Sequence, residues 1–257
     1  MFAEVANTLK KVADGVKNIN NESAEDKEKT NKEFSPKDVE VSENKETQSS
    51  QSSLIDSLLR GNPFGENLAP TDEMKYHMIA GVIDKIDAFN PANWYRLSED
   101  VKVAALQELE NASAEISHRP ACIIDSRDLG AIEERDGVIL GLKGEHIDGH
   151  ITVNSELLNM NSPEALKEVL DTIIHEGRHE YQTYNVNLLL NGNSPTERSF
   201  ELVNAWHINM NELGYKNGEC PFWDIRQIGY KEYLAQPIEV DARVFAENVL
   251  DKTVYFA

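Results

Sequence analysis

The sequence has few cysteines and no long hydrophobic run. Cys122 and Cys220 are its two cysteines in 257 residues. That number is too low for a disulfide-stapled scaffold or a four-cysteine zinc site, and it leaves two readings open: unpaired thiols in a reducing compartment, which we favour, or a single disulfide. No run approaches the roughly 20 apolar residues that cross a bilayer. We therefore expect a soluble protein without a membrane span.

Positive charge is also scarce, with 25 basic against 45 acidic side chains and a net charge of −20. Such a surface repels phosphate groups, which argues against nucleic acid or an anionic membrane as the main partner. The first residues, MFAEVANTLKKVADG, lack the apolar block and cleavage site of a secretory signal. We expect a protein that is cytoplasmic when made; secretion by a specialised machine would not need such a signal.

Apolar residues are nearly absent from residues 21–53, where Phe34, Val39 and Val41 are the only sizeable ones. A segment of this composition cannot bury enough surface to offset the entropy of ordering. Before it, apolar residues recur at spacings of three and four between Phe2 and Val16, as in a short amphipathic helix. We therefore predict a tail at 1–53, with this helix and a disordered polar stretch, and a folded domain at 54–257.

The domain has the pattern of an α+β fold that is mainly helical. Helices are predicted at 54–61, at 71–89 with Thr71 as N-cap, and at 98–116 with Ser98 as N-cap. In the last of these, apolar residues recur at helical spacing: Val101, Ala105, Leu109, Ala112 and Ile116. Short strands are predicted in ACIIDS (121–126), GVILGLKG (137–144) and the alternating GHITVN (149–154).

The next predicted helix carries the main chemical signal, DTIIHEGRHEYQ at 171–182. Ser162 and Pro163 are typical of its start. His175 and His179 lie one turn apart, so both imidazoles can bind one ion. Glu176 is turned about 100° round the helix and would flank the ion. This is the H-E-x-x-H arrangement, in which zinc polarises a water and the glutamate takes its proton. The alternative is a chance pair of exposed histidines.

A catalytic zinc needs a third protein ligand. The H-E-x-x-H-x-x-G-x-x-H extension is excluded, because Gln182 and Asn185 stand where its glycine and histidine would be. A carboxylate from a later helix remains, and four residues offer one: Glu197, Glu201, Glu239 and Asp241. We favour Glu239, in the first turn of a helix that Pro237 opens. Glu201, 22 residues after His179, is the alternative.

Glu239, Ala242, Phe245 and Ala246 match the form E-x-x-A-x-x-F-A. Together with HExxH, this helix resembles the zincin metallopeptidases of the gluzincin type over residues 149–247. HEGRHEYQ followed by QPIEVDAR is also similar to peptidase domains at the ends of bacterial secreted toxins. The chain departs from thermolysin-like enzymes in the 60 residues that separate His179 from Glu239.

The resemblance implies a compact zincin-like domain with Zn²⁺ as cofactor, held by His175, His179 and Glu239, and with Glu176 as general base. It also implies a small sheet whose edge strand borders the active-site helix and binds substrate in extended form. GHITVN is the candidate for that strand.

Several other residues have a functional and a plain interpretation. His146 and His150 would share a face if their strand were continuous, giving a second metal site or, as we favour, a solvent-facing pair beside Asp148. His207, Tyr230 or Tyr233 could donate to an oxyanion, although packed side chains are the simpler interpretation.

Three residues of or near the motif have simpler expected roles. Asp241 could orient a ligand histidine. Arg178 is expected to pair with an acidic neighbour. Gly177 costs about 1 kcal/mol of helix propensity, which would make sense where another segment approaches the metal closely.

These observations predict a zinc-dependent peptidase that acts on a protein or peptide substrate. The toxin resemblance implies a secreted effector, with a secretion apparatus or an immunity protein as partner. The alternative is a catalytically inactive zincin-fold binding module, or a structural component of a secretion or phage-like assembly.

Overall fold

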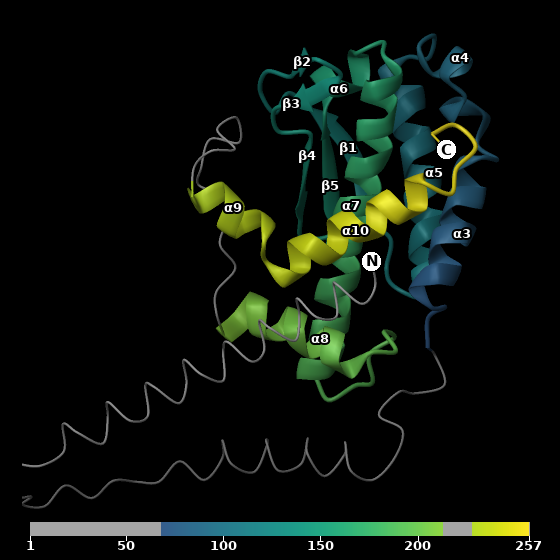
Figure 1. Ribbon diagram of the computed structural model, residues 1–257. Helices are drawn as coiled ribbons and strands as arrows, with labels where there is room; N and C mark the ends of the chain where they lie inside the picture. Colours follow the sequence, from purple (N-terminus) through teal and green to yellow (C-terminus); the bar gives the residue numbers. More distant parts are fainter. Residues whose placement is uncertain (1–67, 213–227, 257) are drawn as a thin grey trace, which may run out of the picture. The chain divides into compact units, whose positions relative to one another are not determined.

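The computed structural model describes residues 68–212 and 228–256, all within the unit Asn62–Ala257 (Figure 1). The predicted tail at 1–53, the predicted helix at 54–61 and Cys220 lie outside the described residues, so these predictions stay predictions. The described part has the predicted α+β fold. Its elements, in order, are α3 (Asp72–Ile83), η1 (Asp87–Phe89), α4 (Pro91–Trp94), α5 (Glu99–Ser117), β1 (Ile123–Arg127), β2 (Glu133–Arg135), β3 (Val138–Leu140), β4 (Gly144–Ile147), β5 (His150–Asn154), α6 (Ser155–Asn159), α7 (Pro163–Leu190), α8 (Phe200–His207), η2 (Ile208–Glu212), α9 (Ile228–Leu234) and α10 (Pro237–Leu250).

The helix predicted at 71–89 is shorter than expected. The Thr71 hydroxyl caps α3 by accepting from the backbone N–H of Met74, as predicted, but the helix ends at Ile83. A 3₁₀ turn and the separate helix α4 follow, and the side chain of Asn90 caps α4 by accepting from the N–H of Ala92 at 2.9 Å. Asn90 and Pro91, which directly follow the predicted helix, therefore start a short new helix. The predicted helix itself is interrupted earlier, at the C-cap Asp84.

The apolar residues that recur at helical spacing in α5 lie partly in the core, where Ala105 and Leu109 are buried, while Ala112 and Ile116 are half-buried. Val101 is 47% exposed, whereas the buried face contains Leu106, Leu109 and two charged residues, Lys102 and Glu110. Buried charges need partners, and both have them: Lys102 Nζ donates to the carbonyl of Leu158 at 2.5 Å, and Glu110 pairs with Arg119. Ser98 stands at the N-cap, but its side chain makes no capping hydrogen bond.

The three-stranded sheet has the order β1-β5-β4. β5 pairs in parallel with β1 and antiparallel with β4, so the expectation that GHITVN is an edge strand is wrong: it forms the central strand. The reason is a two-residue turn, Asp148-Gly149, with both φ angles positive, which folds GEHIDGH into a hairpin. The edge strand that contacts α7 is β4. β2, which we did not predict, pairs with β3 in a separate two-stranded sheet.

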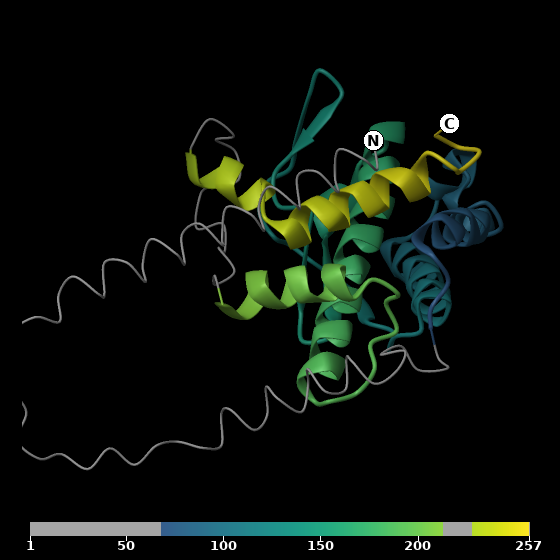
Figure 2. The ribbon, with the colours of Figure 1, turned by 60° about the horizontal axis from the view of Figure 1, so that its bottom comes forward.

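Helix α7 lies at the centre of the fold and is 28 residues long. Ser162 Oγ caps it by accepting from the N–H of Ala165 at 3.2 Å, as predicted. Its apolar stripe packs into the main core, and α10 crosses it in both views (Figures 1 and 2). A smaller core forms where α8 meets the second half of α7; it contains Tyr181, Val186, Val203, Trp206 and Ile238. No helix in the described ranges has the length and apolarity to cross a membrane.

Candidate metal centre

Three predicted ligand residues come together where α10 crosses α7. The Nε2 atoms of His175 and His179 are 3.0 Å apart. Oε2 of Glu239 lies 3.6 Å from Nε2 of His175, and Oε1 lies 3.4 Å from Nε2 of His179. The carboxylate is 1% exposed, while the two histidines are 15% and 14% exposed. The carboxylate is therefore enclosed by the core, whereas the two imidazoles are partly accessible to solvent.

These distances suit a tetrahedral zinc ion. With zinc bonds of 2.0–2.1 Å to nitrogen and oxygen, two tetrahedral ligand atoms are about 3.3 Å apart. The two nitrogens are 3.0 Å apart, and each lies 3.4 or 3.6 Å from one of the two carboxylate oxygens, all close to that value. Two imidazoles and one carboxylate are also the donor set of many catalytic zinc sites. The residues present therefore fit a zinc ion with one position left for water.

The local sequence explains how Glu239 reaches the histidines. Gln236 is the N-cap of α10 and Pro237 its first residue, so Glu239 lies in the first turn. Ala242, one turn later, is fully buried. The small methyl side chain at that position lets α10 pack closely on α7. This packing brings the carboxylate of Glu239, in the first turn of α10, to the two imidazoles.

The charges of the three groups are strongly coupled. Burial opposes the charged form of His179, but a hydrogen bond to Glu239 and the charge of Glu176 outweigh it and raise the pKa of His179 to about 9. Burial likewise opposes ionisation of Glu239, yet hydrogen bonds from both histidines hold its pKa well below the usual range. The carboxylate is therefore ionised at neutral pH, the state that a metal ligand requires.

A chain of hydrogen bonds orients His179. Its Nδ1 lies 2.9 Å from Oε1 of Gln182, and Nε2 of Gln182 donates to Asp241 Oδ2 at 2.7 Å and to the carbonyl of Ile238 at 2.9 Å. Because both partners of the amide nitrogen are acceptors, its oxygen must face the imidazole. Nδ1 of His179 then carries a proton in either charge state of the ring, and Nε2 is the nitrogen that can bind a metal once its own proton is released. Asp241 thus acts on His179 through Gln182, in line with the expectation that it orients a ligand histidine.

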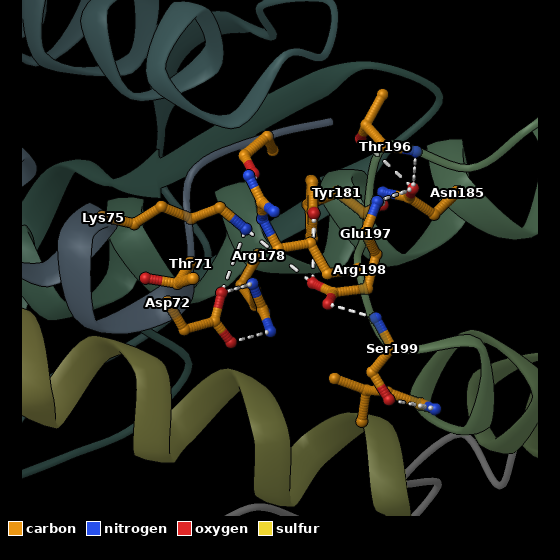
Figure 3. A network of polar contacts seen from close by, with 12 residues as sticks. Thr71, Asp72, Lys75, Arg178, Tyr181, Asn185, Thr196, Glu197, Arg198 and Ser199 are labelled. Carbon is orange, nitrogen blue, oxygen red and sulfur yellow. Dashed lines mark hydrogen bonds and ion pairs between the residues drawn. The ribbon is translucent and has the colours of Figure 1, made fainter. Parts of the chain in front are cut away.

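Arg178 is buried and ties three elements together. Nε and Nη2 donate to the two Asp241 oxygens at 2.8 and 3.0 Å, and Nη1 and Nη2 donate to the two Asp72 oxygens at 3.1 and 2.9 Å. Figure 3 shows the guanidinium facing Asp72, with Lys75 alongside. Arg178 therefore has two acidic neighbours where one was expected. Its pairs with Asp72 and Asp241 hold α3 and α10 against α7, the helix that carries the motif.

A second buried polar group continues this network along α7. Glu197 accepts from the Tyr181 hydroxyl at 3.1 Å and lies 3.8 Å from Lys75 Nζ (Figure 3). Asn185 Oδ1 accepts from the backbone N–H groups of Thr196 and Glu197 at 2.7 and 2.8 Å. Glu197 and Asn185 therefore fix the loop after α7, and Glu197 is not part of the ligand cluster.

The expectation for Gly177 is wrong. A Cβ on this residue would lie 2.7 Å from Nη2 of Arg119 and 3.0 Å from Oε2 of Glu110. The glycine thus makes room for the buried ion pair of Arg119 and Glu110, on the face of α7 that packs against α5. The groups that approach Gly177 closely are therefore the side chains of Arg119 and Glu110, and the metal ligands are not involved.

The other predicted residues lie in various places. Glu176 is half-buried and, as expected, is not among the converging donors of the described residues. Glu201 is exposed in the first turn of α8, where it accepts from Ser199 Oγ at 3.4 Å. The structure thus brings Glu239, and not Glu201, to the histidines. His207 is the last residue of α8, Tyr233 lies on α9, and the side chain of Tyr230 is outside the described residues.

The interpretation of His146 and His150 as a solvent-facing pair is wrong. They lie on opposite strands of the β4–β5 hairpin and not on one continuous strand. His150 is exposed, but the side chain of His146 is only 12% exposed and lies beside Glu180 of α7.

Sequence reasoning missed Gln182, Asp72 and Asp171 as residues of this region. Gln182 could have been found, since it stands three residues after His179 on the same helix face. Asp171 stands one turn before His175; its burial, partly opposed by His175, raises its pKa to about 6. Asp72 comes from a helix 106 residues away from Arg178, and no local pattern points to it.

Comparison of the chain with family models, with curated proteins and with solved structures found no match in any of the three.

Proposed function

We propose that the chain is a zinc-dependent peptidase whose metal is held by His175, His179 and Glu239. The observation that carries the proposal is the convergence of these three donors at tetrahedral separations, with Glu176 next to the first histidine. A bound zinc would supply Lewis-acid polarisation of a water and of the scissile carbonyl.

The protein's own residues would then do the rest. Glu176 takes the proton of the attacking water and passes it to the leaving amine, the usual task of a carboxylate at this position of the motif. Gln182 and Asp241 keep Nδ1 of His179 protonated and its ring fixed. Arg178, with Asp72 and Asp241, anchors the two crossing helices so that the donors stay in place.

The edge strand β4 is the best candidate for binding the substrate. It is the outer strand of the sheet and contacts the helix that carries the motif. An extended peptide could pair with the edge of β4 that no strand of the described residues occupies. This replaces β5, whose two edges are both occupied by neighbouring strands.

The resemblance to toxin peptidase domains extends this proposal. The protein would be made in the cytoplasm, secreted as an effector, and act on a protein or peptide. A secretion apparatus or an immunity protein would then be its partner. The alternative class is a zincin-fold binding module without turnover, or a structural component of an assembly.

Glu176→Gln tests the proposal, because the amide keeps the size of the side chain but cannot take a proton. We expect the variant to bind zinc as the wild type does and to cleave peptides about 10² to 10⁴ times more slowly. Equal cleavage by both proteins would exclude Glu176 as the base. No cleavage of any peptide library by zinc-loaded wild type would favour the binding module.

A further inference from the structure

A second group of donors converges near the contact between β4 and α7. One ligand atom each from Cys122, His146 and Glu180 lies within 4.8 Å of the other two. Cys122 directly precedes β1, His146 is on β4 and Glu180 is on α7. Three segments that are distant in sequence therefore bring one sulfur, one nitrogen and one oxygen together.

The fold directs each side chain into this place. His146 pairs in register with Ile151, which is fully buried, so its ring points to the covered face of the sheet. Cys122 is 1% exposed. Glu180 follows His179 by one residue, so its side chain is turned about 100° round α7 from that ligand. Glu180 and His146 meet where β4 contacts α7.

The contact between His146 and Glu180 has the wrong form for a simple hydrogen bond. Nε2 of His146 lies 2.9 Å from Oε2 of Glu180, yet this covered nitrogen has no partner in hydrogen-bond geometry among the described residues. Buried polar atoms are nearly always satisfied. The two atoms are close but not aligned for a hydrogen bond. Both can therefore face a third atom placed between them.

The nearby charges leave room for a cation. The positive side chain of Arg119 interacts with Cys122 and Glu180, but Glu110 neutralises it through two hydrogen bonds, at 2.6 and 2.8 Å. Oε1 of Glu110 also accepts from the backbone N–H of Cys122 at 2.8 Å, which fixes the position of the cysteine. The carboxylate of Glu180, 2.9 Å from His146, supplies the negative charge that a cation needs.

We propose that Cys122, His146 and Glu180 form a second metal site, which takes a borderline-soft divalent ion such as Zn²⁺ and fastens the edge strand β4 to α7. A thiolate and an imidazole select zinc or cobalt over magnesium and calcium, which prefer oxygen ligands. Zinc–ligand bonds of 2.3 Å to sulfur and 2.0–2.1 Å to nitrogen put the two atoms about 3.6 Å apart. Closing the cluster from within 4.8 Å therefore needs a shift of about 1 Å.

Cobalt titration distinguishes this site from the one formed by His175, His179 and Glu239. A cobalt ion bound to a thiolate has a sulfur-to-metal charge-transfer band in the near ultraviolet, and a site of nitrogen and oxygen donors does not. We expect the metal-free full-length protein to develop this band on addition of Co²⁺. The His175→Ala/His179→Ala double variant should keep it, so that failure of the first site would not affect the result.

Single substitutions assign the sulfur. Cys122→Ser should abolish the band, whereas Cys220→Ser should leave it unchanged. Glu180→Gln, which keeps the size of the side chain, should weaken cobalt binding at this site by at least about tenfold. A folded wild-type protein without a charge-transfer band, or a band that survives in Cys122→Ser and disappears in Cys220→Ser, would overturn the proposal.

Discussion

Oε1 of Gln182 lies 2.9 Å from Nδ1 of His179, and this contact determines which nitrogen of the imidazole can meet a metal. The amide oxygen can only accept, so Nδ1 is the donor and Nε2 points to His175 and Glu239. Partners of this kind are part of how metal sites achieve affinity.

We therefore predict that Gln182→Met weakens zinc binding by about 10- to 100-fold without removing any ligand. Asn187→Ala, at an exposed position of the same helix, is the matched control and should have no effect. Competition with a chromophoric chelator measures both. An unchanged affinity in Gln182→Met would show that the hydrogen bond does not position His179.

Arg178→Met is expected to destabilise the fold strongly. The substitution leaves the carboxylates of Asp72 and Asp241 without their shared cation, and breaking a buried pair in this way typically costs about 3–5 kcal/mol. Arg178→Lys should recover only part of that loss, because one ammonium cannot reproduce four hydrogen bonds. The free energy of unfolding in urea tests this. A loss below about 1 kcal/mol in Arg178→Met would contradict it.

The Asp72–Arg178 contact also predicts how stability changes in acid. Burial alone would raise the pKa of Asp72, but Arg178 and Lys75 outweigh it and lower the pKa to about 2, from 3.8. A lowered pKa stabilises the fold above the unfolded value, and this stabilisation is lost as the pH falls through the folded one.

Between pH 4 and pH 2 the wild type should therefore lose folding free energy that Asp72→Asn does not lose. We expect a loss of up to about 2 kcal/mol, because the carboxylate is a quarter exposed and solvent screens part of its interaction. Urea unfolding curves at several pH values give the comparison. Parallel pH profiles for the two proteins would rule out this role of Asp72.

Gly177→Ala is predicted to destabilise the protein although alanine is the better helix former. The new methyl would lie 2.7 Å from Arg119 and 3.0 Å from Glu110, and overpacking of this kind costs about 1–3 kcal/mol. Gly81→Ala in α3 is the matched control, because a Cβ there meets nothing within 4 Å. That variant should gain up to about 1 kcal/mol from helix propensity. Equal gains in thermal stability for both variants would contradict the packing argument.

The sequence predicted what local patterns can encode. The periodic stripe and cap of α7 and the first-turn position of Glu239 were readable, because each depends on residues within a few positions. The partners of Arg178 and Glu110 were not, because Asp72 and Arg119 reach them only through the tertiary fold. For the same reason, the sequence pattern did not predict that Lys102 and Glu110 of α5 are buried, or that Gly177 makes room for an ion pair.

The sheet shows a similar limit. The alternation in GHITVN identified a strand, but its two neighbours depend on a hairpin turn and a parallel pairing 27 residues away (Ile123 with His150). The alternation within GHITVN therefore does not show whether this strand is central or at the edge, and the prediction of an edge strand is wrong.

Zinc content per chain, measured by mass spectrometry of metals on the full-length protein, tests the central claim most directly. Relative to the zinc-loaded wild type, His179→Ala and Glu239→Ala should each carry one zinc ion fewer, because sites with three protein ligands depend on each of them. Glu201→Ala should carry the full complement, since its carboxylate is exposed on α8. A folded Glu239→Ala protein with undiminished zinc, or loss of zinc in Glu201→Ala alone, would contradict the assignment of the metal centre.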